Sequence, residues 1–247
     1  MLRQLTEQIR YLPSCERGDR PALAYIAGKT ASLMVDAGNS PAHARQFLGA
    51  LKQQGLPAPD YIALTHWHWD HCFGLGALSG TSLCSMETNA KLAEMAQWRW
   101  DDASMAQRLR DGVEIPFCDQ NIRLEYPDRA QIAVCTADLA FSGALCLSLG
   151  DLTAQLLPLP NSHAAGSLAV FVPEEKALIL GDLVCEDFYG SNPPAHHPEK
   201  LAQMILALEA LDFEIALYGH GEPASDSREE LLGYLREELA ACAPKGI

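Results

Sequence analysis

The sequence has little positive charge. It holds 18 Lys and Arg residues against 32 Asp and Glu residues, which gives a formal net charge of −14 at pH 7. No run of basic residues is present. Because affinity for nucleic acid rests largely on Lys and Arg side chains that neutralise phosphates, this balance counts against a nuclease and against any nucleic-acid partner.

Long apolar segments are also missing. No stretch approaches the roughly 18 to 20 apolar residues that cross a bilayer, and residues 1–7 lack the apolar core of a secretory signal. We therefore expect a cytoplasmic protein with no membrane partner. Hydrophobic residues fill 48% of the 247 positions, which is ample for a core. We expect a single domain over 1–247, and the sequence leaves the oligomeric state open.

No pair of cysteines has the C-x-x-C spacing. The eight cysteines are scattered, and many stand in apolar surroundings, as Cys146 does. This distribution favours reduced thiols in a core over a disulfide framework. Cys72 and Cys185 lie close to polar segments described below, so a role in supporting those segments is an alternative to simple packing.

Histidine, by contrast, is concentrated in one place. A short apolar run, residues 61–64, leads into a segment that contains His66, His68, Asp70 and His71. Imidazole nitrogens together with a carboxylate are ligands of zinc and similar divalent metals. Alternate residues of an extended chain point the same way, so the first two histidines can converge on one ion. A bend after them would bring the last two residues to a second ion.

The His66-x-His68-x-Asp70-His71 pattern resembles the signature of the metallo-β-lactamase superfamily. The resemblance implies an α/β (α+β) fold, an αββα sandwich of two mixed β-sheets flanked by helices. Asp36-Ala37-Gly38 resembles a further family motif, whose Asp supports the ligand loop. A turn at the end of a strand is the plainer interpretation of the same residues.

The rest of the chain reads as alternating strands and helices. Turn residues and apolar runs predict strands at 22–26, 31–35, 61–65, 81–84, 144–149, 152–157, 167–172, 177–180 and 214–218. Helices are expected at 41–54, 87–98, 198–211 and from a cap at Ser225 or Asp226 to about 242. We interpret about 98–130 as a helical insertion that forms a lid or a substrate wall. An ordinary pair of surface helices is the alternative.

Three more ligand candidates stand near predicted strand ends: His163, Asp182 and His220. Each matches a later motif of the family, although the segment around His163 departs from the usual Pro-Gly before the histidine and Thr after it. The resemblance assigns His66, His68 and His163 to one metal ion and Asp70, His71 and His220 to the other, with Asp182 bridging them. It implies two divalent ions, most simply Zn²⁺, with Fe and Mn as alternatives.

Such a site retains positions for solvent, which marks a catalytic centre. A hydroxide between the two ions would attack an electrophilic carbonyl or phosphorus. Asp70 is the candidate that orients this hydroxide and passes its proton to the leaving group. Tyr189, Asn192 and Tyr218 are candidates for stabilising the oxyanion. His43, His196 and His197 match no ligand position, and we expect them at the surface, with the last two as weak candidates for lining the pocket.

The aspartate at position 182 is informative within the family, because many antibiotic-hydrolysing members carry Cys or Ser there. An aspartate at this position, together with a histidine directly after Asp70, resembles the ligand pattern of the thioesterase, lactonase and phosphodiesterase branches. We therefore expect a hydrolase acting on a small ester, thioester or lactone. A small phosphodiesterase or phosphonate hydrolase is the alternative enzyme, and a non-catalytic metal-binding module is the alternative from another class.

Overall fold

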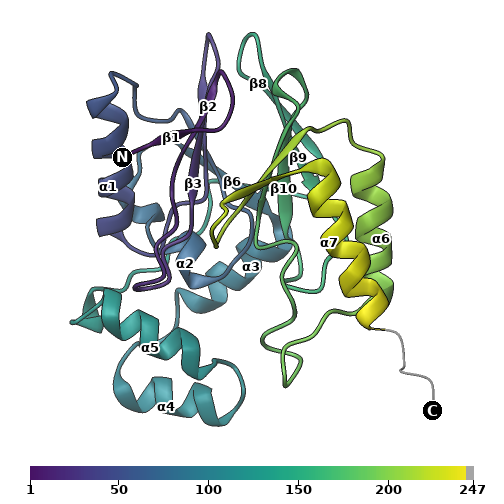
Figure 1. The fold of residues 1–247 in the computed structure, drawn as a ribbon. Helices are drawn as coiled ribbons and strands as arrows, with labels where there is room; N and C mark the ends of the chain where they lie inside the picture. Colours follow the sequence, from purple (N-terminus) through teal and green to yellow (C-terminus); the bar gives the residue numbers. More distant parts are fainter. Residues whose placement is uncertain (243–247) are drawn as a thin grey trace, which may run out of the picture.

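The computed structural model describes residues 1–242 and contains two β-sheets that lie face to face between helices (Figure 1). The first sheet has the order β1-β2-β3-β4-β5-β6-β7 and the second the order β13-β12-β11-β10-β9-β8. The strands of the first sheet are β1 (Arg3–Gln4), β2 (Ile9–Leu12), β3 (Leu23–Ala27), β4 (Ser32–Val35), β5 (Tyr61–Ala63), β6 (Thr81–Ser85) and β7 (Leu139–Phe141). Those of the second are β8 (Leu145–Ser148), β9 (Thr153–Pro158), β10 (Leu168–Val172), β11 (Ala177–Gly181), β12 (Ile215–Tyr218) and β13 (Ser225–Ser227).

Both sheets are mixed. Neighbours from β4 to β7 are parallel, whereas β1 to β4 are antiparallel. In the second sheet β11 and β12 are parallel and the other neighbours are antiparallel. The helices are α1 (Pro41–Gln53), α2 (Trp69–Cys72), α3 (Met86–Met95), α4 (Asp102–Arg110), α5 (Pro116–Glu125), α6 (Pro198–Glu209) and α7 (Arg228–Ala241), with short 3-10 turns at Leu75–Ala77, Arg129–Gln131 and Pro173–Glu175. The predicted αββα architecture is confirmed.

Side-chain alternation along the strands builds three layers of core. In β10, Val170 packs between the two sheets, whereas Phe171 packs under α6 and α7. In β3, Ile26 faces the other sheet, whereas Tyr25 faces the helices on the outside. Successive residues of a strand point to opposite faces, so strands covered on both faces are apolar throughout. This explains why these strands appear in the sequence as short continuous apolar runs.

Most of the expected elements are present within a few residues of their predicted limits. The prediction that Ser225 or Asp226 caps the last helix was wrong. Residues 225–227 form β13 beside β12, and Ser227 caps α7. The Ser227 side chain accepts from Glu230 N, and the Glu230 carboxylate accepts from Ser227 N, which is a capping box. The strands β1, β2, β7 and β13 were not predicted.

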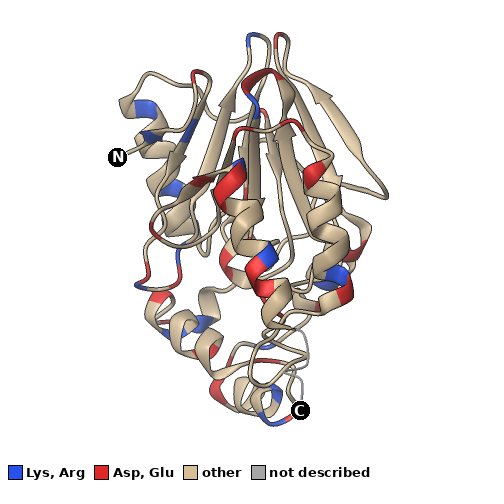
Figure 2. Ribbon diagram, turned by 45° about the vertical axis from the view of Figure 1, so that its right-hand side comes forward, with Lys and Arg blue, Asp and Glu red and all other residues tan. Residues whose placement is uncertain are grey.

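The segment from 98 to 130 contains α4 and α5, which lie together at one end of the sandwich (Figure 1). Its function as a lid stays a prediction. Acidic and basic residues lie mostly in helices and loops, and few of them lie in strands (Figure 2). Within residues 1–242, no helix has the length and apolar character needed to cross a membrane.

Candidate metal centre

All seven predicted ligands lie at one end of the two sheets, in loops or in the short helix α2. His66 and His68 follow β5, and Asp70 and His71 lie in α2. His163 precedes β10, Asp182 follows β11 directly, and His220 follows β12. The parallel strands β11 and β12 end at the same edge of the second sheet, which places Asp182 and His220 side by side. The face-to-face packing of the two sheets places the segment after β5 beside them (Figure 1). All of these side chains are buried except His220, which is partly exposed.

The donor atoms form two adjoining groups. His66, His68 and His163 make up one group, whose donor atoms all lie within 4.8 Å of one another. In this group the Nε2 atoms of His66 and His163 are 3.3 Å apart. Two imidazole nitrogens this close together and aimed at the same point are typical of ligands that share one ion.

The second group contains Asp70, His71, Asp182 and His220, again with donor atoms within 4.8 Å of one another. Asp70 Oδ2 lies 3.0 Å from His71 Nε2 and 3.0 Å from His220 Nε2. Asp182 Oδ2 lies 3.5 Å from His71 Nε2 and 3.8 Å from His163 Nε2 of the first group. Asp182 therefore stands between the two groups.

Residues outside the groups orient the histidine rings. His71 Nδ1 lies 2.7 Å from Asp36 Oδ2. Thr65 Oγ1 lies 2.9 Å from His66 Nδ1, and the Glu186 carbonyl lies 3.0 Å from His163 Nδ1. In each ring the partner at Nδ1 leaves Nε2 to face the centre, which is the arrangement that supports metal-binding histidines.

A glycine beside the centre makes room for a ligand carboxylate. A Cβ atom at Gly219 would lie 2.1 Å from Asp182 Oδ1 and 3.0 Å from His71 Cε1. Any side chain here would therefore displace a proposed ligand. The position between β12 and His220 requires a glycine, because Asp182 and His71 approach its backbone too closely for a Cβ atom.

The electrostatics of the two groups differ. In the first group, burial and then the neighbouring histidines hold the pKa of His66 and of His68 well below the ordinary value. Burial likewise lowers the pKa of His163. These three rings are therefore neutral at pH 7, and a neutral imidazole is the form that binds a metal ion.

The carboxylates dominate the second group. Burial alone would lower the pKa of His220, but Asp182 and Asp70 outweigh it and raise this pKa to about 9. Burial is likewise opposed at His71, where Asp70, Asp182 and Asp36 raise the pKa well above its ordinary value. In the metal-free protein, protons on these rings compensate the buried carboxylates.

The unsatisfied atoms in the centre fit divalent ions. His68 Nε2 and Asp182 Oδ1 are buried and have no hydrogen-bond partner, and buried His71 Nε2 makes no hydrogen bond although Asp70 Oδ2 lies 3.0 Å away. A buried polar atom without a partner costs about 1–3 kcal/mol, and bound cations would satisfy all three atoms. The donor set of imidazoles and carboxylates suits Zn²⁺, Fe or Mn. The ligand role of each residue stays a prediction.

Several other expectations about side chains were wrong. His43 and His196 were expected at the surface, but both are buried, and His197 alone of the three is exposed. His43 packs under the turn at Gly38, and burial lowers its pKa to about 3. All eight cysteines are free as expected, although Cys146 is exposed because β8 is the edge strand of its sheet.

Two of the three proposed oxyanion donors, Tyr218 and Tyr189, have hydroxyls that bond other residues than the proposed ligands. The Tyr218 hydroxyl donates to Asp226 at 3.0 Å, and the Tyr189 hydroxyl donates to Glu114 at 2.9 Å. Asn192 is exposed.

Sequence reasoning missed Asp19, whose Oδ1 lies 3.7 Å from His220 Nδ1. Burial and then the charge of Asp70 raise the pKa of Asp19 to about 7. Asp19 stands in the charged stretch Glu16–Arg20, which reads as an ordinary surface loop. Nothing in the local pattern could have indicated its position beside a ligand.

The family model of the metallo-beta-lactamase superfamily matches residues 17–220. No curated protein matches the chain. A metallo-beta-lactamase from Pontibacter korlensis has a similar structure, with a TM-score of 0.68, 16% identity, and coverage of 97% of this chain and 98% of that one. A motif variant of a metallo-beta-lactamase from Cronobacter sakazakii has a TM-score of 0.68 and 19% identity over 98% of this chain and 94% of that one.

A metallo-beta-lactamase family protein from Thermus thermophilus is also similar, with a TM-score of 0.62 and 19% identity over 96% of this chain and 82% of that one. At these identities, the likeness to solved structures shows the fold alone. The family model matches most of the chain and includes every residue of the two donor groups. The chain belongs to the metallo-beta-lactamase superfamily, most of whose members are metal-dependent hydrolases.

Proposed function

We propose that this protein is a metal-dependent hydrolase that cleaves a small ester, thioester or lactone. The observation that carries the proposal is the pair of adjoining donor groups, in which buried atoms lack protein partners at the point where they converge. One ion would be held by His66, His68 and His163, the other by Asp70, His71 and His220, and Asp182 would be shared. When bound, two divalent ions, by our proposal Zn²⁺, would lower the pKa of water and polarise the substrate oxygen.

Asp70 is suited to handle the proton of the attacking water. Its Oδ2 accepts a hydrogen bond from His220 Nε2 at 3.0 Å. Burial would raise the pKa of Asp70, but the charge of His71 and the hydrogen bond from His220 outweigh burial and lower it. The carboxylate is therefore ionised at neutral pH, so it would accept a hydrogen bond from the water and orient it. Transfer of a proton from Asp70 to the leaving group stays a prediction.

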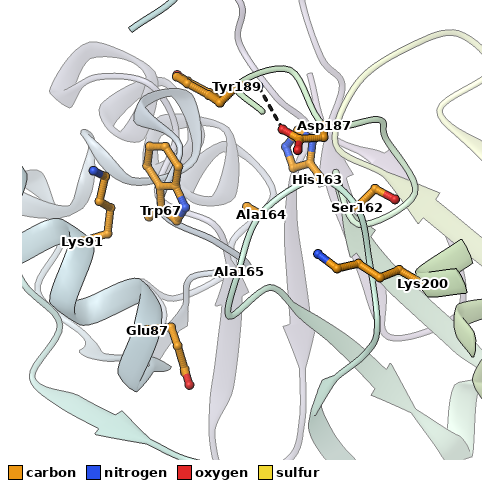
Figure 3. A pocket seen from close by; sticks show the side chains of 10 residues that line it. All are labelled: Trp67, Glu87, Lys91, Ser162, His163, Ala164, Ala165, Asp187, Tyr189 and Lys200. Carbon is orange, nitrogen blue, oxygen red and sulfur yellow. Dashed lines mark hydrogen bonds between the residues drawn. The ribbon is translucent and has the colours of Figure 1, made fainter. Parts of the chain in front are cut away.

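A pocket beside His163 supports a small-molecule substrate. Its volume is about 360 Å³, within the range of small-molecule sites. Trp67 and Tyr189 lie on one side and Lys200 on the other, with the backbone of Ala164 and Ala165 between them (Figure 3). The absence of nucleic-acid and membrane partners and a cytoplasmic location stay predictions.

The proposal is tested by hydrolysis rates of metal-replete protein on four substrates: a glutathione thioester, an acyl lactone, a β-lactam and an aryl phosphodiester. Metal per chain is measured on the same sample. We expect turnover of the thioester or the lactone by protein that holds two metal ions. Preference for the phosphodiester would replace the proposal with the alternative enzyme. Two bound ions without turnover of any substrate class would favour a metal-binding module.

A further inference from the structure

Tyr189 belongs to the second half of the chain, but its side chain packs against the first half. It belongs to the segment of residues 186–197, which joins the second sheet to α6. Yet its side chain packs in the core cluster of the first sheet and its helices. The other residues of that cluster lie between Leu2 and Ala137. Among the described residues, Tyr189 is therefore the one residue from the second half of the chain that packs against this core.

The hydroxyl of Tyr189 is fixed by the helical insertion. It donates a hydrogen bond to Glu114 Oε1 at 2.9 Å and lies 3.4 Å from Cys118 Sγ. Glu114 and Cys118 are both buried, with exposed fractions of 5% and 7%. A hydrogen bond to a buried carboxylate is stronger than one at the surface, because water does not compete for it.

The ring of Tyr189 reaches the metal centre and the pocket. Its centroid lies 5.2 Å from the ring of His68 and 5.4 Å from the ring of Trp67. Tyr189 and Trp67 both line the pocket that His163 borders (Figure 3). One side chain thus contacts a proposed ligand and the pocket with its ring, and the insertion with its hydroxyl.

The rest of the segment is held by contacts within it and by two contacts to the segment around His163, from the Glu186 carbonyl to His163 Nδ1 and from His197 N to Ser162 Oγ. Asp187 N donates to the Ala195 carbonyl at 3.0 Å. Asp187 Oδ1 accepts from the backbone nitrogens of Tyr189 at 3.0 Å and Gly190 at 2.6 Å. These bonds shape the loop locally but do not connect it to the insertion. The connection that sets the position of the Tyr189 ring against the pocket is the one to Glu114.

We propose that Tyr189 is a specificity-determining residue of the pocket and that Glu114 of the insertion is its positioning residue. Tyr189 and Trp67 form an aromatic wall for the acyl part of the substrate, and the hydrogen bond to Glu114 keeps that wall in place. The insertion therefore controls substrate choice through one contact. This inference rests on the proposed hydrolase function and names the group that the pocket receives.

The test compares p-nitrophenyl acetate with p-nitrophenyl hexanoate, because the longer acyl chain reaches the wall and the acetyl group does not. In Tyr189→Phe and in Glu114→Ala we expect KM for the hexanoate to rise about tenfold, the equivalent of one hydrogen bond. In Glu114→Ala, whose side chain does not line the pocket, we expect kcat, KM for the acetate and metal content to stay at wild-type values. Glu114→Ala also removes the hydrogen bond from Ile115 N at 3.0 Å, but the contact that positions the ring is lost in both single variants, so the double variant should raise KM for the hexanoate no further than either of them.

Two controls separate positioning from loss of folding. Glu114→Gln keeps an oxygen that accepts from the tyrosine hydroxyl and should retain wild-type KM for the hexanoate. Tyr61→Phe removes the hydroxyl of another half-buried tyrosine, which packs between the sheets away from the pocket, and should change neither KM. Unchanged KM in Tyr189→Phe, or additive effects in the double variant, would overturn the inference.

Hydrogen exchange provides a readout that needs no turnover. Peptides from residues 186–197 should exchange faster in Tyr189→Phe and Glu114→Ala than in the wild type or Glu114→Gln. If the wild type hydrolyses no ester, thioester or lactone, the proposed function fails. Hydrogen exchange then still tests whether the hydrogen bond from Tyr189 to Glu114 holds the segment in place. Equal exchange in all four proteins would overturn the positioning role of Glu114.

Discussion

Asp36 Oδ2 lies 2.7 Å from His71 Nδ1, and both side chains are buried. The same carboxylate accepts from Thr65 N at 2.7 Å and from Thr65 Oγ1 at 3.0 Å. Thr65 Oγ1 in turn contacts His66 Nδ1. One aspartate outside the donor groups thus orients a histidine in each of them. The sequence motif at 36–38 therefore supports the ligand loop, in addition to ending a strand.

We predict that Asp36→Asn lowers metal affinity about 10- to 100-fold, the usual effect of removing a partner that orients a ligand. Asparagine tolerates the left-handed backbone at this position, where φ is 63°, so the change acts on the hydrogen bonds. Competition with a chelator measures the affinity. Asp138→Asn is the matched control, because Asp138 bonds Ser82 in the same way away from the centre. Equal affinities in the two variants would refute this role for Asp36.

Asp182→Ala should lower metal content and abolish turnover. Asp182 stands between the two donor groups, so its removal takes a ligand from both ions. Metal per chain by mass spectrometry and hydrolysis rates on the same sample provide the measurement. Retention of two ions per chain would show that the residue does not bridge them.

Gly219→Ala should weaken metal binding and destabilise the fold by about 1–3 kcal/mol, the usual cost of overpacking. The new methyl group would meet Asp182 Oδ1 at 2.1 Å. Gly233→Ala in α7 is the control, since nothing lies within 4 Å of its Cβ position and alanine favours a helix. Thermal unfolding and metal titration of both variants provide the test. An unchanged Gly219→Ala protein would mean that this approach is looser than the structure indicates.

Metal binding to the second group should depend on pH. The pKa of His220 is about 9 in the metal-free protein, so an ion must displace its proton at neutral pH. Affinity for the second ion should therefore rise from pH 6 to pH 9. Because the pKa values of His66 and His68 are lowered, affinity for the first ion should change little over that range.

Calorimetric titration with Zn²⁺ in buffers of different ionisation enthalpy measures the proton release. Release of protons with the second ion and not with the first is the expected result. The same raised pKa adds stability to the metal-free fold below about pH 6.5, and this contribution is lost as pH rises through 9. A second step without proton release would contradict the assignment of His220 to that ion.

The sequence indicated the fold and the donor residues because both are encoded locally. Apolar runs placed most strands, and ligand-type residues followed them at His66, Asp182 and His220. The contacts that support the site are encoded at long range. Asp19 reaches His220 across about two hundred residues, and Tyr189 reaches Glu114 from the other half of the chain.

Other errors arose where tertiary packing overrides local pattern. His43 is polar but is covered by the turn at Gly38, so its type gave no sign of burial. The last helix starts later than predicted, at a cap on Ser227, because residues 225–227 pair with β12 as β13. The spacing of Ser227 and Glu230 is nevertheless a capping-box signal. Strand pairing at a sheet edge cannot be read from three residues.

The central claim is that two ions bind side by side among these residues. Anomalous diffraction at the zinc edge, on crystals of protein loaded with Zn²⁺, tests it most directly. We predict two peaks, one within reach of His66, His68 and His163, the other within reach of Asp70, His71 and His220, with Asp182 contacting both ions. A single peak, or two peaks outside these donor groups, would contradict the account.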